Sequence, residues 1–149
     1  DAGTTVLAKT TTSYITISSS GAISASGTPS SMITISADND GDGLIETGET
    51  WRNLYFNSTS GSCSLSSTII ENGTGLLSIY KYGGGLYVYN SQDVTLSNCI
   101  FRNCTAKYGG GIEIKTSNFI VSSCVIDFFL SILPLLSTTA FSTYSFIRP

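Results

Sequence analysis

The 149-residue sequence contains no histidine and few charged residues. Without histidine, the chain can form no Ser-His-Asp triad, no histidine general base and no histidine-ligated metal site. Charged residues make up 11% of the chain, whereas a typical soluble domain has roughly 25%. The seven lysines and arginines are scattered, so the basic patch expected of a nucleic-acid-binding protein is missing. We therefore expect no nucleic-acid partner.

Long apolar runs are also missing. The longest apolar stretch, residues 128–136, is interrupted by Ser131 and Pro134 and is shorter than the roughly 18 residues of a membrane span. We therefore predict no transmembrane helix. Serine and threonine are abundant instead, with 25 and 19 copies that make up 44 of the 149 residues. A hydroxyl-rich surface favours an extracellular or cell-surface location, and a chain that begins at Asp1 without methionine is expected to be part of a longer one.

An internal repeat dominates the middle of the chain. The segment KYGGGL at residues 81–86 returns as KYGGGI at residues 107–112, an offset of 26. The segment at 93–101 returns at 118–126 with an offset of 25, and residues 65–72 align with 96–103 at an offset of 31. These offsets define two full repeats, 54–85 and 86–111, and a partial third, 112–126. A period of this size predicts a solenoid in which each repeat is one layer.

Each repeat contains short segments in which apolar and polar residues alternate. Leu86–Tyr89 and Ile112–Lys115 have the period of two that is typical of strands, and turn residues separate such segments. No stretch of residues 1–126 has a helical period. The sequence therefore predicts an all-β solenoid of about three to five coils over residues 1–126. Equivalent residues should stack between coils, for example Ile70, Phe101 and Ile126.

Two glycine triplets recur at the same place in successive repeats. A coil that turns sharply beneath its neighbour needs positive φ or close backbone approach, and glycine permits both. The six glycines are therefore interpreted as structural turns: Gly83, Gly84, Gly85, Gly109, Gly110 and Gly111.

These motifs resemble those of known parallel β-helix proteins. Gly110-Gly111-Ile112 and Phe101-Arg102-Asn103 are similar to the GGxI and FxxN repeats of polymorphic outer-membrane-protein-type β-helices, with the asparagine one position early. Residues 22–56 resemble the N-terminal coils of secreted bacterial β-helix proteins of the pectate-lyase-like superfamily. There, a run such as residues 25–36 precedes an acidic loop and a tryptophan-containing strand such as Trp51–Phe56. The resemblance implies a right-handed parallel β-helix, and because its motifs are structural it implies little about function.

Half of the ten carboxylates lie within twelve residues, in an insertion at residues 37–50. Their spacing fits the calcium-loop pattern D-x-D-x-D-G-x5-E without a gap, and Gly43 stands at its sharp turn. The flanking residues alternate as strands, so the loop lies in a β context. The spacing predicts a structural Ca²⁺ site, with a solvated acidic turn as the alternative. The predicted ligands are the side chains of Asp38, Asp40, Asp42, Glu46 and Glu49 and the backbone carbonyl of Leu44.

Four cysteines are present, and none of them forms a CxxC motif. Cys99 and Cys124 fall at equivalent positions of successive repeats, where a Cα spacing of roughly 4.8 Å is within disulfide reach. A disulfide and a reduced, buried cysteine ladder are both open, and the ladder is favoured. Tyrosines near the glycine turns are compatible with a sugar-binding surface or with side-chain ladders: Tyr80, Tyr82, Tyr87, Tyr89 and Tyr108.

Residues 127–149 form an apolar tail that breaks the repeat, and either a C-terminal cap or a truncation artefact explains it. The functional hypothesis is a non-catalytic β-helix scaffold segment of a secreted or cell-surface, adhesin-like protein. Its expected partners are a host or matrix protein or a glycan. The alternative is a fragment of a polysaccharide lyase or glycoside hydrolase. The scaffold is favoured because the carboxylates cluster in one loop and Arg102 has no evident carboxylate partner at an equivalent coil position.

Overall fold

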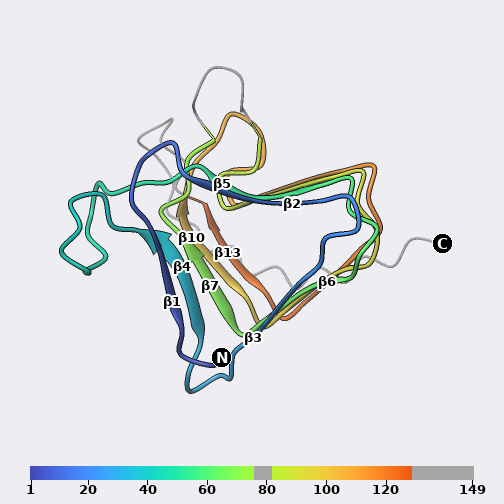
Figure 1. Ribbon diagram of the computed structural model, residues 1–149, viewed down its shortest axis with the longest axis horizontal. Coiled ribbons are helices and arrows are strands. Elements are labelled where there is room, and N and C mark those ends of the chain that lie inside the picture. The colour runs from blue at the N-terminus through green and yellow to red at the C-terminus, as the bar shows by residue number, and fades with distance from the viewer. Residues whose placement is uncertain (76–81, 129–149) are drawn as a thin grey trace, which may run out of the picture.

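The computed structural model describes residues 1–75 and 82–128 as β-strands joined by turns and loops (Figure 1). The first sheet contains β1 (Thr5–Ala8), β4 (Ile33–Ala37), β7 (Thr68–Glu71), β10 (Ile100–Cys104) and β13 (Val125–Phe128) in this order. The second sheet contains β2 (Tyr14–Ser18), β5 (Asn53–Asn57), β8 (Leu86–Tyr89) and β11 (Ile112–Lys115). The third sheet contains β3 (Ile23–Ser26), β6 (Cys63–Ser66), β9 (Val94–Ser97) and β12 (Phe119–Ser122).

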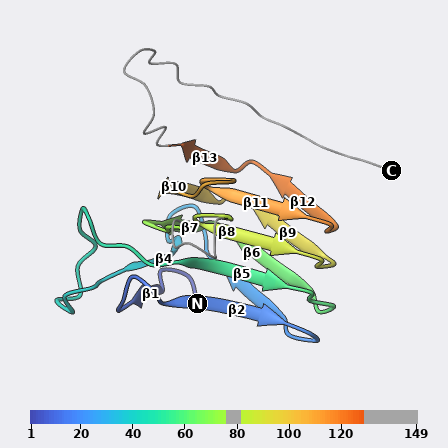
Figure 2. The ribbon, with the colours of Figure 1, turned by 90° about the horizontal axis from the view of Figure 1, so that it is seen from above.

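Each strand from β1 to β10 pairs in parallel with the strand three places further along the chain. The chain therefore visits the three sheets in turn and adds one layer per circuit, and Figure 2 shows these layers stacked on one another. This arrangement confirms the predicted all-β parallel β-helix, with about four coils. The predicted strands at Leu86–Tyr89 and Ile112–Lys115 are confirmed as β8 and β11. The described residues contain no helix, and hence no helix able to cross a membrane.

The core is a set of apolar columns that run along the solenoid axis. In the first sheet Ile35 pairs with Ile70, Ile70 with Phe101, and Phe101 with Ile126, which confirms the predicted stack. Ile70 and Phe101 are completely buried. Parallel pairing in register places like residues above one another, so each coil covers the apolar side chains of the previous one.

The corners between sheets are made by polar residues with positive φ. Ser67, Asn98 and Ser123 have φ of 45°, 52° and 51° at the corner between the third and first sheets. Asn72 and Asn103, with φ of 59° and 52°, follow β7 and lie at the end of β10. Asparagine tolerates this left-handed conformation better than other residues with a Cβ. The repeated left-handed residue turns each coil by the same amount and so keeps successive layers in register.

The glycine triplets meet two separate requirements. Gly83 and Gly109 have φ of 51° and 57°, which side chains with a Cβ rarely adopt. Gly84 has no positive φ, but a Cβ built on it would lie 2.2 Å from the carbonyl oxygen of Gly110 in the next coil. The amide of the buried Asn53 side chain also donates to the carbonyl of Gly83 at 2.8 Å. The turns are therefore packed directly on one another.

The strands extend beyond the segments that the repeat delineated. A further coil, formed by β2, β3 and β4, precedes the first predicted repeat. At the other end, β13 continues to Phe128, two residues past the predicted limit of the solenoid. Most of the predicted apolar tail, residues 129–149, and the segment 76–81, which includes Tyr80, lie outside the described residues.

Candidate metal centre and the groove beside it

The acidic loop joins β4 to β5 and projects from the corner between the first and second sheets (Figure 1). β4 ends at Ala37, which is completely buried, and the next residue, Asp38, is also completely buried. The loop therefore begins inside the solenoid wall and returns to it at the buried Trp51. The wall fixes both ends of the insertion.

Three aspartates converge in the first half of the loop. One carboxylate oxygen each of Asp38, Asp40 and Asp42 lies within 4.8 Å of the other two. Asp38 is buried, whereas Asp40 and Asp42 are exposed. The structure thus brings together three of the six predicted ligands.

Backbone N–H groups of the loop donate to these carboxylates. The N–H of Gly41 donates to Oδ1 of Asp38 at 2.7 Å, and the N–H of Gly43 donates to Oδ2 at 3.1 Å. The N–H of Asp42 donates to Oδ1 of Asp40 at 3.2 Å, and the N–H of Leu44 donates to Oδ1 of Asp42 at 2.8 Å. Such bonds stabilise negative charge and shape the loop around its own side chains.

Lys9 contributes a cation that sequence reasoning missed. Its Nζ forms an ion pair with Oδ2 of Asp38. The pairing of Ala8 with Ala37 places the next residue of each coil side by side, and the N–H of Asp38 donates to the carbonyl of Ala8 at 2.9 Å. The hydrogen bond from Lys9 is the main cause that lowers the pKa of Asp38; burial opposes it, and the N–H groups of Gly41 and Gly43 assist.

Glu49 accepts backbone hydrogen bonds from the loop, and its role as a metal ligand stays a prediction. Its Oε1 accepts hydrogen bonds from the N–H groups of Asn39 and Asp40, and its Oε2 accepts from the N–H of Glu46 at 3.2 Å. Neither Glu46 nor Glu49 belongs to the group formed by the three aspartates. Glu49 therefore closes the loop in this conformation. The side chain of Leu44 is 60% exposed, and the ligand role of its carbonyl stays a prediction.

The donor set fits a hard divalent cation. All converging side-chain donors are carboxylate oxygens, which Ca²⁺ and Mg²⁺ prefer. The ammonium of Lys9 holds one of these oxygens, but its side chain is 59% exposed and long enough to turn into solvent when a cation takes its place. In such a site the three aspartates would hold the ion, and the ion would neutralise them.

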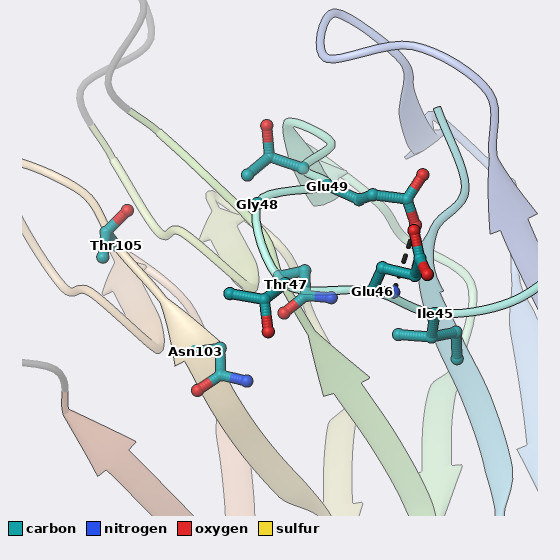
Figure 3. A pocket seen from close by; sticks show the side chains of 9 residues that line it. Ile45, Glu46, Thr47, Gly48, Glu49, Asn103 and Thr105 are labelled. Atoms are coloured by element: carbon teal, nitrogen blue, oxygen red, sulfur yellow. Dashed lines mark hydrogen bonds between the residues drawn. The ribbon is translucent and has the colours of Figure 1, made fainter. Parts of the chain in front are cut away.

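A polar groove of about 420 Å³ lies between the second half of the loop and the ends of β7 and β10. Figure 3 shows Glu46 and Glu49 on the loop side and Asn103 and Thr105 on the solenoid side. The groove is lined by Ile45, Glu46, Thr47, Gly48, Glu49, Thr50, Asn72, Asn103 and Thr105. Its lining offers amides, hydroxyls and carboxylates.

The tyrosines form ladders on the outer side of the second sheet. Ring centroids are 4.9 Å apart for Tyr55 and Tyr87, 5.3 Å for Tyr82 and Tyr87, and 5.4 Å for Tyr82 and Tyr108. The Nζ of Lys115 lies 3.3 Å from the ring centroid of Tyr82. Because ring faces cover one another or contact a lysine, the arrangement favours a packed ladder over a sugar platform. Burial and the neighbouring tyrosines raise the pKa of Tyr87 to about 12.

One expectation about charge is wrong. Arg102 does have a carboxylate partner at an equivalent coil position, because β10 pairs with β7 so that Arg102 is opposite Glu71. The Nε of Arg102 lies 2.6 Å from Oε2 of Glu71. This arginine is thus part of the solenoid wall.

The chain matches no protein-family model, no curated protein and no solved structure. The resemblance to outer-membrane-protein-type and pectate-lyase-like β-helices therefore rests on the sequence motifs alone. The three parallel sheets are seen in the structure.

Proposed function

We propose that the protein is a non-catalytic β-helix scaffold segment of a secreted or cell-surface, adhesin-like protein, whose loop at residues 38–49 holds a structural Ca²⁺ ion. The convergence of Asp38, Asp40 and Asp42 within 4.8 Å is the observation that carries the proposal. Three carboxylates at this separation repel one another unless a cation joins them. The ion would hold the long insertion against the solenoid.

Calcium titration of the whole chain tests this site directly. We expect one ion per chain with a dissociation constant of roughly 10⁻⁴–10⁻³ M, the range of extracellular modules. At about 5 mM Ca²⁺ this binding adds about 1–2 kcal/mol to the free energy of unfolding. The melting temperature should then rise by about 3–6 °C relative to EDTA.

Substitutions separate the site from the general charge of the protein. Asp40→Asn combined with Asp42→Asn should abolish the calcium-dependent shift, because both side chains lose their charge. Asp93→Asn is the matched control, since Asp93 is exposed, lies outside the loop and has a φ of 53° that asparagine also tolerates. Equal melts in calcium and EDTA for the parent chain would contradict the proposed ion.

The scaffold role is supported by how the side chains are used. Interior residues stack in apolar columns, the tyrosines pack on one another, and Arg102 pairs with Glu71. A lyase or glycosidase needs acidic and basic groups that face a substrate from several positions. Incubation of the calcium-loaded chain with polyuronates and neutral polysaccharides should release no unsaturated or reducing product. Turnover that is lost in a variant of the acidic loop would favour the enzyme.

The partner of such a scaffold would be a host or matrix protein or a glycan on the outside of the cell. Binding of the labelled chain to immobilised matrix proteins and to a glycan array, in calcium and in EDTA, tests this part of the proposal. Binding to none of these surfaces would argue against the adhesin-like role and leave the calcium site untouched.

A further inference from the structure

We propose that Cys99 and Cys124 form a modification site: a disulfide that staples β13 to β10 when a disulfide oxidant such as oxidised glutathione reaches it. This inference is independent of the proposed calcium site. It concerns the end of the stack at which the last described coil lies on the one before it (Figure 2).

The backbone already holds the two cysteines opposite each other. Ile100 pairs with Val125, so the residues directly before them occupy equivalent positions of neighbouring coils. The N–H of Val125 donates to the carbonyl of Cys99 at 2.9 Å. Adjacent strands lie about 4.8 Å apart, and disulfides span Cα separations of about 4.4–6.8 Å. At that spacing the pair lies within disulfide range.

The side chains also lie together. The N–H of Cys99 donates to Sγ of Cys124 at 3.4 Å. Each thiol also donates at 3.3 Å to the carbonyl two residues earlier, Ser97 for Cys99 and Ser122 for Cys124. The two side chains therefore have the same orientation. A rotation about one Cα–Cβ bond can turn one sulfur toward the other.

The two thiols differ in access and acidity, which defines the order of reaction. Cys99 is completely buried, whereas Cys124 is partly exposed. Hydrogen bonds from the thiol and then the backbone of Cys99 lower the pKa of Cys124 to about 7, while burial opposes them. The same thiol–thiol contact, followed by burial, raises the pKa of Cys99. Cys124 is thus the thiolate that solvent reaches first, and Cys99 is the resolving thiol.

The remaining cysteines are internal controls. Cys63 is buried opposite Val94, and its Sγ contacts Thr59 and the carbonyl of Gly61. Cys104 is buried, its Sγ donates to the carbonyl of Arg102, and burial is the main cause that raises its pKa to about 11. Neither is paired with a cysteine in a neighbouring described strand, so we expect both to stay reduced.

The chemistry balances as two successive exchanges. The Cys124 thiolate attacks one sulfur of oxidised glutathione, the S–S bond of glutathione breaks, and one glutathione thiolate leaves and takes up a proton. The Cys99 thiol then gives up its proton, and its sulfur attacks Cys124 in the mixed disulfide. The second glutathione leaves as a thiolate and takes up that proton. Two cysteine thiols are oxidised by two electrons, and one oxidised glutathione becomes two reduced molecules.

The bond would stabilise the last described coil, whose apolar side chains are partly exposed. Phe119, Ile120 and Val125 in the last strands are 38%, 63% and 55% exposed. A covalent link at the start of β13 closes a loop that contains β11 and β12, so these strands could no longer separate independently from the stack. Proteolytic cleavage within residues 112–128 should slow by about tenfold or more in the oxidised protein.

The test is incubation of the complete, native chain with a glutathione redox buffer, followed by acid quench, alkylation in denaturant and peptide mass mapping. We expect two thiols lost per chain, one linked peptide pair containing Cys99 and Cys124, and fully alkylated Cys63 and Cys104. In Cys99→Ser, a stable glutathione adduct should accumulate on Cys124. In Cys124→Ser, no thiol should be lost.

Mapping of the parent chain needs no variant to fold, so the inference can fail in its own right. It is overturned if all four thiols survive, if Cys124 of the parent chain keeps glutathione without forming the link, or if the link joins any other pair. It is also overturned if the oxidised chain is cut within residues 112–128 as fast as the reduced one.

Discussion

The Nε of Arg102 lies 2.6 Å from Oε2 of Glu71 in the preceding coil, and the two residues are directly paired across β7 and β10. The Glu71 side chain is 5% exposed, and the Arg102 side chain is 47% exposed. The carbonyl of Glu71 also accepts a hydrogen bond from Nε1 of the buried Trp51 at 2.8 Å. Glu71 thus contacts Arg102 in the next coil through its side chain and Trp51, just before β5, through its carbonyl.

Replacing Arg102 should lower the free energy of unfolding, because Glu71 loses its partner. Arg102→Met leaves a nearly buried carboxylate unpaired, which is costly, but solvent around the half-exposed arginine site reduces the effect. We expect a loss of about 1–2 kcal/mol in the free energy of unfolding, measured by urea denaturation. Lys107→Met, which removes an exposed positive charge elsewhere, is the control. Addition of Glu71→Gln should recover part of the loss, and a fully additive double variant would show that the two side chains do not interact.

The ion pair of Lys9 with Asp38 should make the stability of the protein depend on pH in the acid range. The pKa of Asp38 in the folded chain is below the ordinary 3.8. The ionised Asp38 therefore stabilises the fold at pH values above 3.8. This stabilisation is lost as the pH falls through the lower folded-state pKa. Lys9→Met should flatten the fall in melting temperature below about pH 4, measured in EDTA. Lys107→Met is the control and should leave the fall in melting temperature as it is in the parent chain. If Lys9→Met also left it unchanged, this account would be contradicted.

Gly84 should tolerate no side chain, because a Cβ there would lie 2.2 Å from the backbone oxygen of Gly110. Backbone cannot move aside without shifting a whole coil, so Gly84→Ala should cost about 3 kcal/mol or more and lower the melting temperature by about 8 °C. The matched control is Gly43→Ala, where φ is 87° but no atom lies within 4 Å of the added Cβ. That variant should lose only about 1–2 kcal/mol. A reversed order of the two variants would refute the packed-turn explanation.

Alkylation of Cys124 should depend on pH in a way that reports its contact with Cys99. The reactive thiolate becomes more abundant as the pH rises through the pKa, which is about 7 for Cys124 and about 11 for the buried Cys104. The rate of iodoacetamide labelling at Cys124 should therefore reach half its maximum near pH 7. Cys99→Ala removes the thiol donor, so the half-maximum should move upward toward the ordinary cysteine value. An unchanged midpoint would exclude the contact.

The repeat was sufficient to predict the solenoid because stacking is visible in the sequence itself. Residues 65–72 and 96–103 align at an offset of 31, and the structure pairs Ile70 with Phe101 at that offset. The same alignment places Glu71 opposite Arg102, so this ion pair could have been found from the sequence. The coil of β2, β3 and β4 lies within the predicted solenoid but shows no internal repeat, because its residues pair with the next coil without resembling it: Ile23 pairs with Cys63, and Tyr14 with Asn53.

The candidate metal centre was only partly accessible to the same reasoning. Spacing identified Asp38, Asp40 and Asp42, because alternate residues of a tight loop point to the same side. Spacing could not reveal that Glu49 accepts backbone hydrogen bonds that close the loop. Lys9 was out of reach, because its position beside Asp38 depends on the register of β1 against β4.

Variation in coil length is concentrated between the first and second sheets. In the second sheet, Ile15 pairs with Leu54, Leu54 with Leu86, and Leu86 with Ile112, so successive coils contain 39, 32 and 26 residues. The acidic loop and the glycine triplets lie in these connections. A foreign peptide inserted there, for example for epitope display, should leave strand pairing intact, since the solenoid already tolerates additional residues at this corner. The opposite corners, with their recurrent left-handed serines and asparagines, should reject the same insert.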